Sequence, residues 1–238
     1  INTEICYNDH NWISFYNKKT GGLEMVYTVT FNPAVDYVIH TDGIIDGSTN
    51  RTRSEEVYIG GKGINVSFVL AELGITSKVF GFVAGFTGEY IENGIREKGI
   101  ETDFVHLKSG FSRINVKIKS SSETEINGNG PDITENDVKS MFEKLSELKN
   151  GDTIVLAGSV PNSLPHDIYE HILEILSDRK IRIIVDATKD LLLKSLKYKP
   201  FLIKPNKHEL GEIFGVKLTS LDEIKTYATK LKDMGAQN

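Results

Sequence analysis

The chain has 238 residues, and its apolar (39%) and charged (26%) fractions are ordinary for a globular protein of one large or two small domains. A net charge of −5 gives no general attraction to nucleic acid or to an anionic membrane, and no apolar run approaches the roughly 18 residues of a membrane span. The single cysteine, Cys6, excludes a disulfide within the chain and agrees with a cytoplasmic protein.

Residues 1–24 differ in character from the rest of the chain. They are rich in asparagine, hold the only tryptophan and show no clear period. An alternating β-rich run then begins at Met25. We therefore expect Met25 to be the natural start and residues 1–24 to be an upstream or non-native extension. A genuine N-terminal extension is the alternative.

After Met25, apolar strand patterns alternate with helical patterns. This alternation predicts βαβ units, a mainly parallel sheet and helices on both of its faces, which is a doubly wound α/β fold. The predicted strands are Met25–Phe31, Val79–Val83, Thr153–Leu156, Ile181–Val185 and Phe201–Ile203. The predicted helices are Gly63–Leu73, Glu89–Lys98, Glu135–Leu148, His166–Ser177, His208–Phe214 and Leu221–Met234.

Two stretches interrupt this rhythm with polar strands. The first is Asp36–His40 with Arg51–Ile59, and the second is Ser112–Lys119 with Glu123–Ile126. Polar and apolar residues alternate along them, as in strands with one exposed face. They predict a small second sheet beside the main one.

The first candidate site residue, Asp36, closely follows the first strand. Ligands of open α/β sheets bind beyond the carboxyl ends of the strands. A carboxylate at that place can accept hydrogen bonds from sugar hydroxyls. The structural alternative is an aspartate that only closes a turn.

The second candidate is a glycine-rich stretch that opens a helix. Gly60, Gly61 and Gly63 allow backbone N–H groups to approach an anion, and a helix N-terminus favours negative charge. Lys62 adds a positive charge and Asn65 an amide. The stretch fits neither the P-loop nor the dinucleotide-binding pattern. A flexible turn with a solvated lysine is the structural alternative.

Two further candidates lie downstream. Arg113, on a polar strand, could clamp a phosphate through two parallel hydrogen bonds, although a solvated strand arginine has the same pattern. Lys204, Asn206 and Glu209 follow the apolar strand at Phe201–Ile203. Asn206 and Glu209 fit two roles equally well. They could form a helix-capping pair, or they could hold Mg²⁺ near nucleotide phosphates.

Together these stretches resemble the PfkB/ribokinase family of carbohydrate kinases from Met25 to about the last residue. Within that family they are most similar to the 1-phosphofructokinase subgroup. The order and spacing of several motifs carry the resemblance: Thr28–Asp36, Gly60–Val66, Gly85–Gly88, Ser112–Lys117, Glu123–Asn127, Gly158–Pro161 and Lys204–Asn206.

The resemblance implies a ribokinase-like fold whose small sheet, at about residues 36–59 and 111–127, is a lid over the sugar site. A homodimer through that lid is also implied. Asp36 would bind sugar hydroxyls, and Gly60, Gly61, Lys62 and Asn65 would line the sugar-phosphate site. Lys62 and Arg113 would hold the phosphate that the substrate already carries.

The cofactors implied are ATP and Mg²⁺. Lys204, Asn206 and Glu209 would face the ATP phosphates, with Glu209 at the metal. The reaction implied is phosphorylation of fructose 1-phosphate to fructose 1,6-bisphosphate, with no nucleic acid or membrane partner. Phe68 and Ala84 depart from the family pattern, where arginine and glycine are common.

The largest departure is at the end of the chain. The family's Gly-Ala-Gly-Asp motif, whose aspartate is the general base, is absent from the 238 residues. We therefore expect residues 25–238 to be an incomplete kinase domain without its catalytic residue and final strands. The alternatives are a tagatose-6-phosphate kinase, a truncated kinase that only binds sugar phosphate, and a gene fragment without function.

Overall fold

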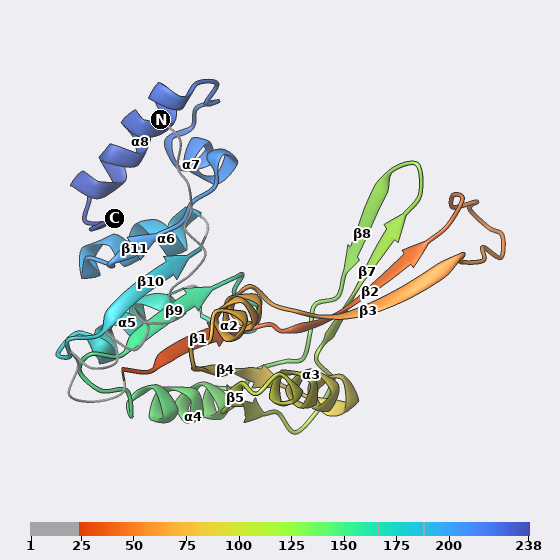
Figure 1. Ribbon diagram of the computed structural model, residues 1–238, viewed down its shortest axis with the longest axis horizontal. Coiled ribbons are helices and arrows are strands. Elements are labelled where there is room, and N and C mark those ends of the chain that lie inside the picture. The colour runs from red at the N-terminus through yellow and green to blue at the C-terminus, as the bar shows by residue number, and fades with distance from the viewer. Residues whose placement is uncertain (1–23, 166, 188) are drawn as a thin grey trace.

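The computed structural model describes residues 24–165, 167–187 and 189–238, so the extension expected at residues 1–24 lies almost wholly outside it. Two sheets form the molecule (Figure 1). The larger is a seven-stranded parallel sheet that carries the helices, and the smaller is a four-stranded sheet that projects away from it. The doubly wound α/β fold with a small second sheet is therefore confirmed.

The large sheet has the strand order β11-β10-β9-β1-β4-β5, with β6 also paired to β4. Its strands are β1 (Val26–Thr30), β4 (Ser77–Val83), β5 (Glu101–Thr102), β6 (Val105–His106), β9 (Thr153–Ala157), β10 (Arg182–Asp186) and β11 (Leu202–Ile203). The five predicted strands are all present. The two that the sequence did not reveal, β5 and β6, have two residues each, too few for a pattern.

Helices cover both faces of this sheet. They are α2 (Lys62–Glu72), α3 (Gly85–Glu97), α4 (Glu135–Leu145), α5 (Ile168–Leu176), α6 (Lys189–Ser195), α7 (Lys207–Phe214) and α8 (Leu221–Asp233), with the 3₁₀ turn η1 (Leu196–Tyr198). The six predicted helices are present. Helix α3 begins at Gly85 rather than Glu89, because the Gly-Phe-Thr-Gly stretch forms its first turn instead of a loop.

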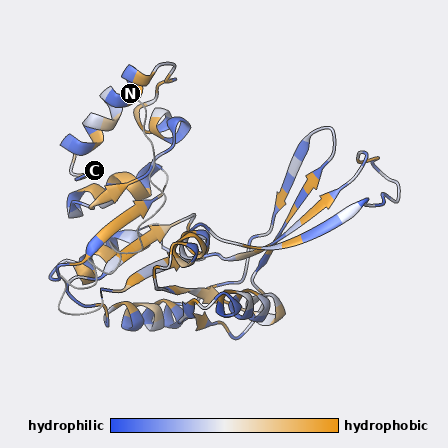
Figure 2. Ribbon diagram, viewed as in Figure 1, coloured by the Kyte–Doolittle hydropathy of each residue, from blue (hydrophilic) through white to orange (hydrophobic). Residues whose placement is uncertain are grey.

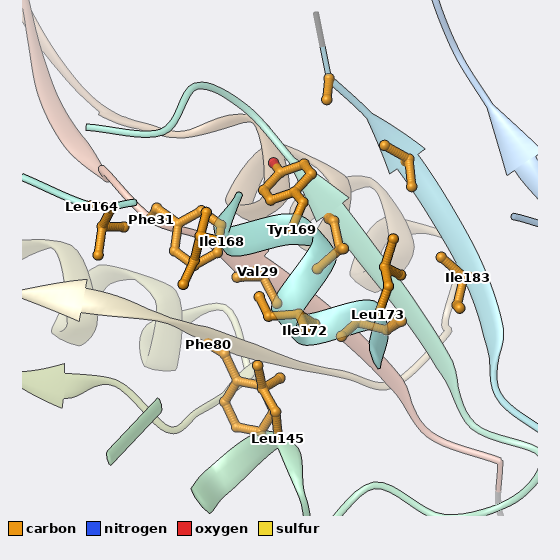
Figure 3. Close-up of a cluster of buried hydrophobic side chains, with 14 of the residues drawn as sticks. Val29, Phe31, Phe80, Leu145, Leu164, Ile168, Tyr169, Ile172, Leu173 and Ile183 are labelled. Carbon is orange, nitrogen blue, oxygen red and sulfur yellow. The ribbon is translucent and has the colours of Figure 1, made fainter. Parts of the chain in front are cut away.

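Alternate side chains of β4 enter two different cores. Phe80 and Phe82 join the larger cluster, where α4 and α5 pack on one face of the sheet (Figure 3). Val79 and Val83 join the smaller cluster on the other face, with Ile64 of α2 and residues of α3. A strand buried on both faces has the continuous apolar sequence seen here. Figure 2 shows the same apolar character along the central strands.

The small sheet has the strand order β3-β2-β7-β8. Its strands are β2 (Ala34–His40), β3 (Ser54–Gly60), β7 (Arg113–Lys119) and β8 (Glu123–Asn127). Strands β2 and β7 are parallel, whereas the two outer pairs are antiparallel. The sequence predicted the strands but not this central parallel pairing, which joins segments that are distant in the chain.

The two faces of the small sheet differ in polarity, since side chains alternate along each strand. One cross-strand row contains Tyr58, Asp36, Asn115 and Asn127. The next row, on the opposite face, contains the apolar residues Val57, Tyr37, Val116 and Ile126. The polar face therefore carries the residues suited to a ligand, and the apolar face is suited to packing.

Strand β11 lies at the edge of the large sheet. The backbone of Ile203 donates a hydrogen bond to the carbonyl of Asn238, and that of Gln237 donates to Pro200. The last residues of the chain therefore lie beside β11. Within the described residues, no helix is long and apolar enough to cross a membrane.

The packing of α5 gives a stability test. Ile172 is fully buried beneath the sheet, whereas Ile175 on the same helix is 37% exposed. We expect Ile172→Ala to lower the free energy of unfolding by about 2–5 kcal/mol, because a buried cavity is created. Ile175→Ala is the matched control and should cost under about 1 kcal/mol. Urea denaturation measures both, and equal losses would contradict this packing.

Candidate active site

Asp36 lies in β2, on the polar face of the small sheet, and both of its carboxylate oxygens have partners. The amide nitrogen of Asn115 donates a hydrogen bond of 2.8 Å to Oδ1. The ammonium of Lys117 lies 3.0 Å from Oδ2. Both partners belong to β7, because the parallel register places Asn115 directly beside Asp36. The hydrogen bond to Asp36 is the main reason that the pKa of Lys117 is raised.

Gly60, at the end of β3, allows the Asp36 carboxylate to lie against the strand. A Cβ atom added at Gly60 would lie 2.9 Å from each of three carboxylate atoms of Asp36. Gly60 therefore serves to seat a side chain, whereas the sequence suggested only that it gives an anion access to the backbone.

Asn115 is held in one orientation by the charge beside it. A carboxylate only accepts hydrogen bonds, so the NH₂ group of the amide must face Asp36. The oxygen, Oδ1, is consequently turned away from Asp36, and it is buried without a hydrogen-bond partner in the described part of the chain. Such an acceptor costs free energy, of order 1–3 kcal/mol. The sequence had singled out this asparagine only as part of a motif.

Arg113 lies at the base of the same strand. Its Nε donates a hydrogen bond of 3.1 Å to the backbone oxygen of Asn32, in the turn between β1 and β2. Burial lowers the pKa of the guanidinium, while the charge of Asp36 opposes that effect. An arginine guanidinium is not deprotonated in proteins, so the group stays positively charged near neutral pH.

A cavity of about 950 Å³ lies between the small sheet and helices α2 and α3. Three of the predicted substrate residues line it, namely Asp36, Gly60 and Asn65. Phe68, one of the two departures from the family pattern, and Lys117 line it as well. Residues from distant parts of the sequence thus share one cavity.

Helix α2 begins at Lys62 and packs tightly on β1. Gly61 has a φ of 138°, in the region that favours glycine, and a Cβ atom there would lie 2.8 Å from Thr30. A Cβ atom on Gly63 would lie 2.7 Å from the carbonyl oxygen of Val29. The backbone of Ile64 donates to the Thr30 hydroxyl. These contacts fix the backbone at Lys62, from which its side chain extends.

The Lys62 ammonium lies among carboxylates at the carboxyl ends of the parallel strands. It is 3.6 Å from Oδ1 of Asp186 and 3.9 Å from Oε1 of Glu209. The ammonium of Lys204 lies 3.3 Å from the other oxygen of Asp186. Lys62 from the glycine-rich candidate and Lys204 and Glu209 from the downstream candidate therefore come together around Asp186.

Asp186 is the site residue that the sequence analysis missed. It ends β10, is 8% exposed, and its Oδ1 has no hydrogen-bond partner among the described residues. The nearby charge of Asp186 also contributes to the raised pKa of the buried Tyr169, after burial itself. An aspartate directly after the apolar run at Ile181–Val185 was the available signal, since ligands bind beyond such strand ends.

Asn206 and Glu209 form a complete capping box at the start of α7. Oδ1 of Asn206 accepts hydrogen bonds from the backbones of His208 and Glu209, and Oε2 of Glu209 accepts one of 2.8 Å from the backbone of Asn206. The structural role predicted for this pair is therefore confirmed. Oε1 of Glu209 takes no part in the cap.

Two carboxylate oxygens beside Lys62 suit a magnesium ion that is shared with a nucleotide. Mg²⁺ is commonly held by one or two carboxylates together with waters and substrate phosphates. Oδ1 of Asp186 and Oε1 of Glu209 accept no hydrogen bond from the described residues, although the Lys62 ammonium lies 3.6 and 3.9 Å from them. No group of three or more His, Cys, Asp or Glu side chains that could hold a metal ion occurs in the residues that the structure covers.

The family profile described as pfkB family carbohydrate kinase matches residues 29–238. The chain belongs to the PfkB family of carbohydrate kinases. Relatives of known function in this family are similar over 90% of the chain. A 1-phosphofructokinase of Bacillus subtilis is 50% identical over 214 residues, which are 70% of its length. A D-tagatose-1-phosphate kinase of Bacillus licheniformis is 39% identical over 70% of its length.

A solved PfkB-like structure agrees with the fold. Phosphofructokinase-2 of Escherichia coli in complex with fructose 6-phosphate has a TM-score of 0.81 and 24% identity, and the match covers 90% of this chain and 71% of that one. At this identity the likeness concerns the fold alone. The sequence relatives support the coarser conclusion that the chain is of the sugar-phosphate kinase type, with phosphoryl transfer to an alcohol group as its chemistry.

The seat of Asp36 can be tested with Gly60→Ala. Gly60 does not have a positive φ, so alanine should not strain the backbone there. Its Cβ atom would clash only with the Asp36 carboxylate. We expect the displaced carboxylate to weaken sugar-phosphate binding about tenfold or more, in line with the loss of a charge-assisted hydrogen bond. Calorimetry measures the affinity and thermal unfolding checks the fold. A variant that binds like the wild type would show that Asp36 is not a ligand.

Proposed function

We propose that these residues, acting together with the general base of the family, phosphorylate the C6 hydroxyl of fructose 1-phosphate with ATP and yield fructose 1,6-bisphosphate. The observation that carries the proposal is the position of α2. Asn65 and Gly60 lie at the cavity beside the small sheet, and Lys62, at the start of the same helix, lies between Asp186 and Glu209. One short segment therefore joins a sugar site to a nucleotide site.

Each group of residues has a part in the reaction. Asp36 would accept hydrogen bonds from sugar hydroxyls, and Arg113 would hold the phosphate already present on the sugar. The sequence suggested that Lys62 holds the sugar's own phosphate, but its ammonium lies beside Asp186 and Glu209. Lys62 and Lys204 would therefore neutralise charge on the transferred phosphoryl group, which gains most from positioning and electrostatic stabilisation. A magnesium ion held by Asp186 and Glu209 would supply further positive charge at the ATP phosphates. The small sheet would act as the lid that excludes water.

The general base is the part that this chain lacks, because the Gly-Ala-Gly-Asp motif does not occur in it. Loss of a positioned base typically costs on the order of 10²–10⁴ in rate. We therefore propose that residues 1–238 alone bind substrate with little or no turnover. A protein that only binds sugar phosphate is the second candidate. Both readings place the protein in the cytoplasm, where sugar phosphates and ATP are found.

The sugar remains to be chosen between two C4 epimers. The tagatose alternative from the sequence was the 6-phosphate, whereas the tagatose kinases among the relatives are named for the 1-phosphate. Fructose 1-phosphate is favoured because the 50% identical relative is named for it. Both sugars share the C1 phosphate that Arg113 would hold.

Calorimetry on the 238-residue chain tests the proposal. We expect fructose 1-phosphate to bind more tightly than tagatose 1-phosphate. A coupled kinase assay that follows ADP release should show little or no turnover. Arg113→Ala should weaken fructose 1-phosphate binding about tenfold or more, because a charge-assisted contact is lost. Arg53→Ala, an exposed arginine near the same sheet, is the control. No binding of either sugar phosphate would overturn the proposal.

We also propose that two copies of the chain pair through the apolar face of the small sheet. Val57 and Ile126, at the two edges of its apolar row, are 46% and 60% exposed. Tyr37 and Val116 lie between them. An exposed apolar row across a whole sheet is typical of an interface. A twofold pairing would bury it against the same row of a second copy.

Val57→Lys combined with Ile126→Lys tests this pairing. We expect the double variant to sediment as a monomer where the wild-type chain sediments as a dimer, because four charges would be buried at the interface. Asn127→Lys is the matched control, since Asn127 is exposed on the opposite, polar face of the same strand. A monomeric wild type across the concentration range would contradict the proposal.

A further inference from the structure

The ion pair between Asp36 and Lys117 lies where the sugar should bind. Both residues line the cavity beside the small sheet. Their side chains are only 16% and 29% exposed, so water screens the pair weakly. The residue that is expected to receive sugar hydroxyls is therefore already engaged by a cation from its own sheet.

The other sides of the Asp36 carboxylate are also occupied. Asn115 takes Oδ1, and the backbone of Gly60 lies against the carboxylate so closely that it leaves no room for a Cβ atom. Lys117 holds Oδ2 at 3.0 Å. Of the three neighbours, Asn115 is buried in the sheet and Gly60 is backbone, whereas Lys117 has a long flexible side chain that lines the cavity. Lys117 is therefore the one neighbour that can leave.

We propose that Lys117 is a specificity-determining residue that exchanges Asp36 for the phosphate of the substrate. Before a substrate binds, its ammonium pairs with the Asp36 carboxylate. When a sugar phosphate enters, its ammonium turns to the phosphate group, and the released Oδ2 accepts a sugar hydroxyl. This inference rests on the proposed function, because it requires a substrate that is already phosphorylated.

The exchange is favourable only for a phosphorylated sugar. A phosphate carries close to two negative charges at neutral pH and attracts an ammonium more strongly than a single carboxylate does. A neutral sugar offers hydroxyl groups alone, and these cannot compensate for the separation of a poorly solvated ion pair. The pair thus discriminates against unphosphorylated sugars, in addition to any contact that Arg113 makes with the phosphate.

The proposal predicts opposite effects of one substitution on two ligands. Lys117→Met keeps the aliphatic stem and removes the charge. We expect it to weaken binding of fructose 1-phosphate by about tenfold or more, as for the loss of a charged hydrogen bond. Binding of unphosphorylated fructose should strengthen several-fold, because Asp36 is released. Calorimetry measures both affinities, and a residue with a purely structural role would weaken both.

Lys119→Met is the matched control, since Lys119 lies two residues further along the same strand and also lines the cavity. It should leave fructose binding unchanged. A second measurement needs only the wild-type chain. Inorganic phosphate should raise its affinity for fructose, since phosphate draws Lys117 away, and by linkage fructose should raise the affinity for phosphate.

The outcomes separate this proposal from the proposed function. Suppose that the wild-type chain binds fructose 1-phosphate, that Lys117→Met does not bind fructose more tightly, and that inorganic phosphate does not raise the affinity for fructose. This outcome overturns the exchange and leaves the kinase assignment intact. A wild-type chain that binds no sugar phosphate overturns both. The exchange is established if Lys117→Met binds fructose more tightly, Lys119→Met does not, and the thermal unfolding of both variants matches that of the wild type.

Discussion

The close packing of the first turn of α2 on β1 is the constraint on which the rest of the site depends. Gly63 approaches the backbone of Val29 so closely that no side chain could be placed there, and Thr30 binds the helix through its hydroxyl. Because this turn cannot shift, Lys62 is held at the carboxyl ends of the strands and Asn65 at the cavity. A helix loosely attached to the sheet could not hold these two side chains in a fixed arrangement.

The same edge of the sheet gathers charge of both signs. Asp186 ends one strand, and Lys204 follows the next, so the parallel arrangement brings them together. Two lysines and two carboxylates lie close together here, and their charges balance one another. Incoming phosphates and a metal ion would divide this cluster by charge, with the lysines at the phosphates and the carboxylates at the metal. Oδ1 of Asp186 is buried without a hydrogen bond from the described residues and has only the Lys62 ammonium nearby, which makes this cluster suited to a ligand.

The small sheet separates polar and apolar side chains onto its two faces. Its alternation gives one polar face, where Asp36 and its partners lie, and one apolar face with Val57 and Ile126 exposed. A single sheet can therefore contact a substrate on one side and a second protein on the other. Because Asp36 and Lys117 belong to neighbouring strands, the state of the ion pair is set within this sheet and needs no movement of the large one.

The sequence by itself determined the alternation of strands and helices, the glycine-rich helix start and the capping box at Asn206, because each depends on residues close together in the chain. It also supplied the order of motifs that marks the family. Only the tertiary structure decided that β2 pairs with β7, that Gly60 seats Asp36, and that Asp186 joins Lys62. These contacts connect residues far apart in the chain, and the local pattern of apolar and polar residues does not show which distant segments will meet. Their physical origin is the sheet, which brings distant strand ends to one edge.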